Sequence, residues 1–193
     1  MKELVLSKKV ALLIIDMQNE FVSEGGAIKC PSGQDIIPNI KKLLKLIREK
    51  GISVIYAQEL HRTQKVDFGR ELGEEPEHCL EGSWGAEIIS ELTPREEDFL
   101  IPKRRYSAFF ATDLEILLKG LDIDTLIITG VVTDICVRAT AQDAQQLDYK
   151  VIVPEECVAG TSVEQHKAAL KHIQYILGKV VSLEKLESAL KSY

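Results

Sequence analysis

The chain has 193 residues, which is the size of one domain with room for an insertion. Hydrophobic residues make up 45% and charged residues 28%, and no apolar run reaches the roughly 18 residues that a membrane span needs. The formal net charge of -6 disfavours a surface for nucleic acid or anionic membranes. The four cysteines are too few for a disulfide framework and no signal peptide is recognisable, so we expect a cytoplasmic protein.

Short apolar runs alternate with amphipathic stretches along most of the chain. The apolar runs predict strands at 10–15, 52–56, 125–129 and 150–153. The amphipathic stretches predict helices at 34–50, 112–119, 136–147 and 163–177. Such alternation is typical of a parallel sheet with helices on both faces, which binds ligands at the carboxyl ends of its strands.

The segment at about 58–100 interrupts this alternation. It is longer than an ordinary connection in a compact domain, and it holds two of the four histidines and the single tryptophan. We therefore predict one domain over 1–193 with a functional loop insertion at about 58–100.

Asp16, Lys103 and Cys136 each follow an apolar run, so the predicted sheet brings them to one edge. Cys136 also lies at or near the start of a predicted helix, where peptide dipoles and free N–H groups lower the pKa of a thiol and hold an oxyanion. A cysteine nucleophile needs a base and a charge partner, for which Asp16 and Lys103 are candidates. Taken singly, Asp16 reads as a turn residue and Lys103 as a solvated lysine, while Cys136 reads as either a nucleophile or a buried structural cysteine.

Glu59, His61 and His78 form a second group, within the 58–100 segment. Two imidazoles and a carboxylate are the ligands of a facial metal site with open positions, and zinc, iron and manganese all accept this set. On spacing alone, the competing interpretation is two surface histidines in a polar loop.

Three segments, in this order and spacing, resemble those of the isochorismatase-like cysteine hydrolases: ALLIIDMQNEF, KRRYSAF and GVVTDICVRAT. This family includes nicotinamidases, N-carbamoylsarcosine amidases and ureidoacrylate-type amidohydrolases. The resemblance spans about 10–160 and implies a three-layer α-β-α, Rossmann-like fold with a six-stranded, mostly parallel sheet.

The resemblance also implies a role for each residue of the first group. Asp16 corresponds to the general base, Lys103 to the cation that stabilises charge, and Cys136 to the nucleophile. The family carries a non-proline cis peptide, which would join Val131 and Val132 here. That bond turns the Val132 N–H inward to form an oxyanion hole with the N–H of Cys136.

The metal group is similar too, because nicotinamidases bind a divalent metal through an Asp-x-His pair and a later His followed by Cys. Glu59, His61 and His78 match these positions, with Glu in place of Asp. The resemblance thus implies a divalent metal, with zinc as the first candidate, and no organic cofactor.

The residues predicted to contact substrate are Phe21, Tyr106, Trp84, Arg105 and Arg138. Phe21 and Tyr106 match pocket positions of the family. Glu75 stands where nicotinamidases have a tryptophan, and Trp84 is the candidate to replace that ring. An inward-pointing Arg105 or Arg138 would clamp a substrate carboxylate, against the alternative that both are surface arginines.

The resulting prediction is a cysteine amidohydrolase that cleaves a small amide, N-carbamoyl or ureido compound through a thioester and releases ammonia. The alternatives are a nicotinamidase or, outside enzymes, a thiol redox sensor or metal-binding protein on the same fold. A dehydrogenase is disfavoured because no G-x-G-x-x-G follows the first strand. The predicted partners are a small-molecule substrate and further copies of the chain in a dimer or tetramer.

Overall fold

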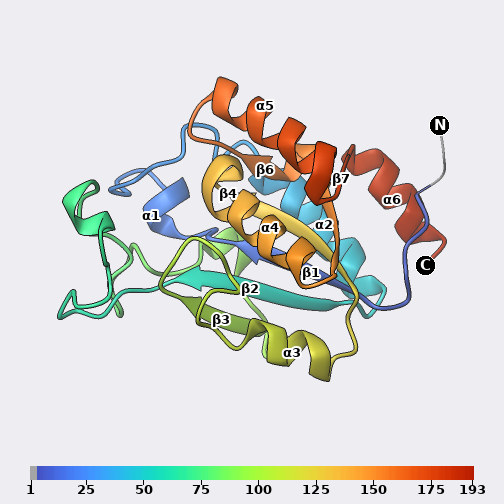
Figure 1. The fold of residues 1–193 in the computed structure, drawn as a ribbon, viewed down its shortest axis with the longest axis horizontal. Helices are drawn as coiled ribbons and strands as arrows, with labels where there is room; N and C mark the ends of the chain where they lie inside the picture. Colours follow the sequence, from blue (N-terminus) through green and yellow to red (C-terminus); the bar gives the residue numbers. More distant parts are fainter. Residues whose placement is uncertain (1–3) are drawn as a thin grey trace.

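The computed structural model describes residues 4–193, and its centre is a parallel sheet (Figure 1). The strand order is β3-β2-β1-β4-β5-β7, with the short β6 paired to β4. The strands are β1 (Val10–Ile15), β2 (Ser53–Glu59), β3 (Phe99–Lys103), β4 (Thr125–Val131), β5 (Lys150–Pro154), β6 (Val158–Ala159) and β7 (Lys179–Val181). The sheet thus has the six strands that the family resemblance implies, four of them predicted from the apolar runs, with the two-residue β6 as an addition.

Helices cover both faces of this sheet. They are α1 (Asn19–Val22), α2 (Ile37–Glu49), α3 (Leu114–Gly120), α4 (Arg138–Gln146), α5 (Val163–His172) and α6 (Leu183–Lys191). Two π-helical turns, η3 (Thr133–Val137) and η5 (Ile173–Leu177), begin α4 and end α5, while η4 (Glu155–Cys157) is a 3₁₀ turn. The α/β layering predicted from the alternation is therefore confirmed.

Alternate side chains of β1 supply the two hydrophobic cores. Leu12 and Ile14 pack in the cluster that holds the apolar faces of α2 and α6. Leu13 and Ile15 pack in the cluster that holds α3, α4 and the end of α5. Because all six residues of β1 are buried, the continuous apolar run indicates a central strand rather than an edge.

The segment between β2 and β3 carries two short 3₁₀ turns, η1 (Glu71–Gly73) and η2 (Ser90–Leu92). Its green loops extend beyond the carboxyl ends of the strands in Figure 1. An isolated bridge pairs His61 with Leu80, which folds the segment back on itself. No helix among residues 4–193 is both long and apolar enough to cross a membrane.

Candidate active site

Asp16 is the first residue beyond β1, and its side chain is buried. Its backbone turns sharply, with a positive φ of 51°, a conformation that aspartate tolerates better than most residues. Its N–H donates to the carbonyl of Ala57 at 3.0 Å. Beside it, Gly130 approaches so closely that an added Cβ would lie 2.0 Å from the Ile15 carbonyl oxygen. The turn therefore directs the Asp16 carboxylate over the end of the sheet.

Lys103 ends β3 directly opposite Glu59 in the register of the β2–β3 pair. Its ammonium lies 2.8 Å from Asp16 Oδ2 and 2.8 Å from Glu59 Oε2. The same nitrogen is 3.8 Å from the sulfur of Cys136. Burial alone would lower the pKa of Lys103, but the neighbouring carboxylates of Asp16 and Glu59 hold that pKa well above its ordinary value. Lys103 is therefore a buried, charged ammonium between two carboxylates.

Cys136 lies in η3, where β4 gives way to α4, and its side chain is buried. Burial raises the pKa of its thiol well above the ordinary value, and the nearby charges of Asp16 and Glu59 add to this against the opposing effect of Lys103. The predicted lowering of this pKa by the helix N-terminus is thus wrong for this arrangement. A neutral thiol needs a base before it can attack, and Asp16 is the carboxylate beside it.

The pKa of Asp16 is raised to about 6, first by burial and further by Glu59, while Lys103 opposes the shift. A carboxyl group with a pKa near neutrality can both accept and return a proton under physiological conditions. The structure thus brings Asp16, Lys103 and Cys136 together as the sequence predicts.

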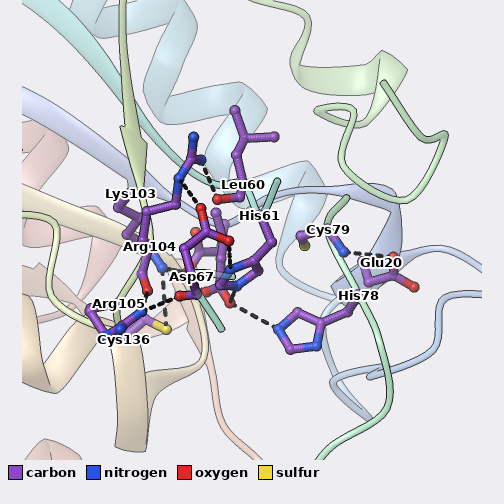
Figure 2. A network of polar contacts seen from close by, with 12 residues as sticks. Glu20, Leu60, His61, Asp67, His78, Cys79, Lys103, Arg104, Arg105 and Cys136 are labelled. Carbon is purple, nitrogen blue, oxygen red and sulfur yellow. Dashed lines mark hydrogen bonds and ion pairs between the residues drawn. The ribbon is translucent and has the colours of Figure 1, made fainter. Parts of the chain in front are cut away.

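Glu59, His61 and His78 converge on one point beside this cluster. The Nε2 atoms of His61 and His78 lie 3.3 and 3.0 Å from Glu59 Oε1, and one donor atom from each residue falls within 4.8 Å of the others. Figure 2 shows both imidazoles in the same polar network as Lys103 and Cys136. The expectation that the three residues meet is confirmed, and the competing interpretation as surface histidines is wrong because both rings are buried.

The far side of each imidazole faces an oxygen atom. His78 Nδ1 is 2.8 Å from the carbonyl of Pro76, and His61 Nδ1 is 3.6 Å from Asp67 Oδ1. Outer partners of this kind fix the tautomer of metal-binding histidines. The ring of Phe68 stacks on His61 at 3.9 Å between centroids. Two oriented imidazoles and one carboxylate therefore fit a divalent metal such as zinc.

Glu59 contacts both clusters, with Oε2 on Lys103 and Oε1 on the imidazoles. Burial would raise the pKa of Glu59, but Lys103, His61 and His78 together lower it well below its ordinary value. Glu59, which stands where the family has Asp, thus joins the two clusters through its two carboxylate oxygens.

Two buried residues of the first motif support this site, and our sequence analysis did not assign them. The side chain of Gln18 donates to the Glu59 carbonyl and accepts from the Glu59 N–H, each at 2.8 Å. Glu20 accepts from the N–H of Cys79 at 3.1 Å and of Ala27 at 2.7 Å. The signal available in the sequence was a run of polar residues directly after a buried strand.

A cavity of about 200 Å³ opens onto Cys136, and Phe21, Tyr106 and Val132 are among its lining residues as predicted. This is smaller than the ~300–1,000 Å³ of pockets for drug-sized ligands. The predicted cis peptide between Val131 and Val132 is present.

Trp84, Arg105 and Arg138 do not belong to the described lining of this cavity, contrary to expectation. The indole of Trp84 is half exposed. The guanidinium of Arg105 donates instead to the carbonyl of Asp67, and Arg138 is exposed on α4. The arginine clamp predicted from the sequence therefore has no support in the geometry.

The fold and these two clusters define an α/β protein with a buried Asp–Lys–Cys group beside a two-histidine, one-carboxylate site. The model of the Isochorismatase domain matches residues 10–185. The chain therefore belongs to the isochorismatase family of hydrolases, whose amidohydrolase members act on C–N bonds outside peptides.

Curated relatives align over most of their length. A protein of Arabidopsis thaliana, described as a probable inactive nicotinamidase, is 37% identical over 91% of this chain and 93% of its own. A ureidoacrylate amidohydrolase, RutB of Pantoea ananatis, is 33% identical over 91% of this chain and 80% of its own.

Solved structures agree with this family assignment. An isochorismatase-like hydrolase of Alkaliphilus metalliredigens has a TM-score of 0.88 and 38% identity, covering 94% of this chain and 98% of that one. A pyrazinamidase of Pyrococcus horikoshii in complex with zinc has a TM-score of 0.83 and 32% identity, covering 90% and 99%.

Proposed function

We propose that this protein is a cysteine-dependent amidohydrolase that cleaves a small amide, N-carbamoyl or ureido compound and releases ammonia. The observation that carries the proposal is the buried contact of Lys103 with both Asp16 and Cys136, of which Cys136 lines a small cavity. The similarity to a ureidoacrylate amidohydrolase supports the ureido class.

In the proposed reaction, Asp16 takes the proton of the Cys136 thiol, and the sulfur attacks the substrate carbonyl carbon. The backbone N–H groups of Val132 and Cys136 donate to the oxyanion, while the Lys103 ammonium stabilises the negative charge that Asp16 and Cys136 share. The C–N bond breaks as Asp16 returns the proton to the leaving nitrogen. Asp16 then deprotonates a water molecule, which attacks the thioester carbonyl and releases the acid and the free thiol.

A direct test is ammonia release by the purified protein from nicotinamide, pyrazinamide, N-carbamoylsarcosine, a ureido acid and biuret. We expect turnover of an N-carbamoyl or ureido acid and none in the Cys136→Ala variant. Release from nicotinamide alone would instead support the second candidate, a nicotinamidase, which the zinc-bound pyrazinamidase neighbour favours. Ammonia release from none of the five compounds would contradict the amidohydrolase proposal.

A thiol sensor on this fold is disfavoured. Sensor cysteines are low-pKa thiolates, whereas burial raises the pKa of Cys136. A base beside the thiol serves catalysis rather than sensing. The predicted cytoplasmic location and homo-oligomeric state remain predictions, and light scattering of the purified protein tests the second.

The rate should depend on the protonation of Asp16. Its pKa of about 6 means that the carboxyl group is protonated below that pH and cannot accept the thiol proton. We therefore expect kcat/KM to rise with pH through about 6 and to level off above it. The profile is measured between pH 4.5 and 8, and a rate that is flat down to pH 4.5 would contradict Asp16 as the base.

We also propose that Glu59, His61 and His78 hold one divalent metal ion, with zinc as the first candidate. When bound, such an ion supplies Lewis-acid polarisation of a substrate atom. His61 and His78 present their Nε2 atoms toward Glu59 Oε1, where the ion would bind. Glu59 also accepts a hydrogen bond from Lys103 through its second oxygen.

Elemental analysis of the purified protein tests the metal site. We expect about one metal ion per chain, and its loss in the His61→Ala variant. His172→Ala, on an exposed face of α5, is the matched control and should keep the metal. Equal metal content in both variants would contradict the site.

A further inference from the structure

The cavity above Cys136 carries a lysine that the proposed mechanism does not use. Among the described lining residues, Lys29 is the one lysine or arginine side chain. The remaining lining side chains are mostly apolar, apart from the carboxylates Glu59 and Glu75, His78 and Thr161. Glu59 is already engaged with Lys103 and the imidazoles.

The backbone around Lys29 is fixed against the rest of the site. The N–H of Cys30 donates to the Phe21 carbonyl at 2.7 Å, and the thiol of Cys30 donates to the Gly160 carbonyl at 3.3 Å. Two residues before Lys29, the N–H of Ala27 donates to the buried Glu20 at 2.7 Å. These anchors hold the Lys29 backbone beside the cavity.

The Lys29 side chain, by contrast, has an easily replaced partner. Its ammonium pairs with Glu24, and the two side chains are 31% and 81% exposed. An exposed pair of this kind contributes little, because water screens it. A substrate carboxylate in the cavity can therefore displace Glu24 from the ammonium at small cost.

We infer that Lys29 determines specificity by binding the carboxylate of a small ureido or N-carbamoyl acid whose carbonyl lies at Cys136. The inference rests on the proposed amidohydrolase function and narrows it to anionic substrates. The lining arrangement supports it, because Arg105 and Arg138 lie outside the described lining and Lys29 is the one lysine or arginine within it. The cavity volume of about 200 Å³ limits the acid to a short chain.

The test compares N-carbamoylglycine with its uncharged methyl ester in wild type and Lys29→Gln. In the variant we expect KM for the acid to rise about tenfold, with kcat nearly unchanged, because one charge-assisted contact is lost. The KM for the ester should stay within about twofold, because the ester presents no charge to Lys29. Glu24→Gln should leave KM for the acid unchanged or lower it, and Lys45→Gln on α2 is the distant control.

Calorimetric titration of the Cys136→Ala variant separates recognition from turnover. There the acid should bind more tightly than the ester, and adding Lys29→Gln should remove the difference. Equal losses for acid and ester would overturn the role of Lys29, as would tighter binding of the ester. If the wild type hydrolyses neither compound yet the acid binds through Lys29, the amidohydrolase proposal fails while the carboxylate site stands.

Discussion

Replacing Cys136 by alanine is expected to reduce kcat/KM by about 10⁴-fold or more, because the thiol forms the covalent intermediate. Removal of the nucleophile leaves the cavity and the polar cluster in place, so the fold should persist. Ammonia release from the best substrate of the panel measures the loss. Circular dichroism and thermal unfolding check that the variant is folded.

The matched control is Cys157→Ala. Cys157 is also a free, buried cysteine, but it lies in the core on the α2 and α6 face, and the described cavity lining does not include it. This variant should lose stability through the small void and keep its kcat. Mass spectrometry of the wild type, quenched during turnover, should find the acyl adduct on the peptide containing Cys136. Full activity of Cys136→Ala would exclude the thioester mechanism.

The sequence allowed prediction of the sheet and of the convergence of Asp16, Lys103 and Cys136. Continuous apolar runs mark buried parallel strands, and parallel strands carry their carboxyl ends to one edge. The topology alone therefore places a polar residue at the carboxyl end of such a strand on this edge of the sheet. The same reasoning places Glu59, which the structure finds at the last position of β2.

The side-chain directions could not be predicted in this way. Arg105 and Arg138 are close in sequence to Lys103 and Cys136, yet one donates to the Asp67 loop and the other is exposed on α4. Lys29 lines the cavity, and its neighbour Cys30 contacts Gly160, a residue 130 positions away. Contacts of this kind are set by tertiary packing rather than by local pattern.

The protonation state of Cys136 likewise could not be predicted from the local sequence, because it depends on tertiary contacts. A helix start and a nearby cation such as Lys103 both stabilise a thiolate, but burial of the sulfur opposes them. Here the sulfur is buried and faces two carboxylates, and both burial and those charges favour the neutral thiol. The contact between Glu59 and Lys103 likewise depends on the register of β2 and β3.

Replacing Lys103 by methionine is expected to cost both activity and stability, because the ammonium is the shared partner of two buried carboxylates. Breaking a buried ion pair by removing one partner destabilises a protein by about 3–5 kcal/mol. Asp16 would lose the cation that lowers its pKa, so its pKa would rise further and less of it would be ionised as a base at neutral pH. Urea unfolding and the pH profile of kcat/KM measure the two effects.

Two further variants make the Lys103 experiment specific. Lys9→Met removes an exposed lysine that pairs with Asp122, and water screens a surface pair of this kind, so the protein should stay near wild-type stability. Lys103→Met combined with Asp16→Asn removes the cation together with one of its carboxylates. We expect the double variant to regain part of the lost stability and none of the activity, because the buried charge is partly balanced while the base is gone. If Lys103→Met unfolds at the wild-type urea concentration, the two carboxylates do not depend on the ammonium, and the electrostatic account of this site is wrong.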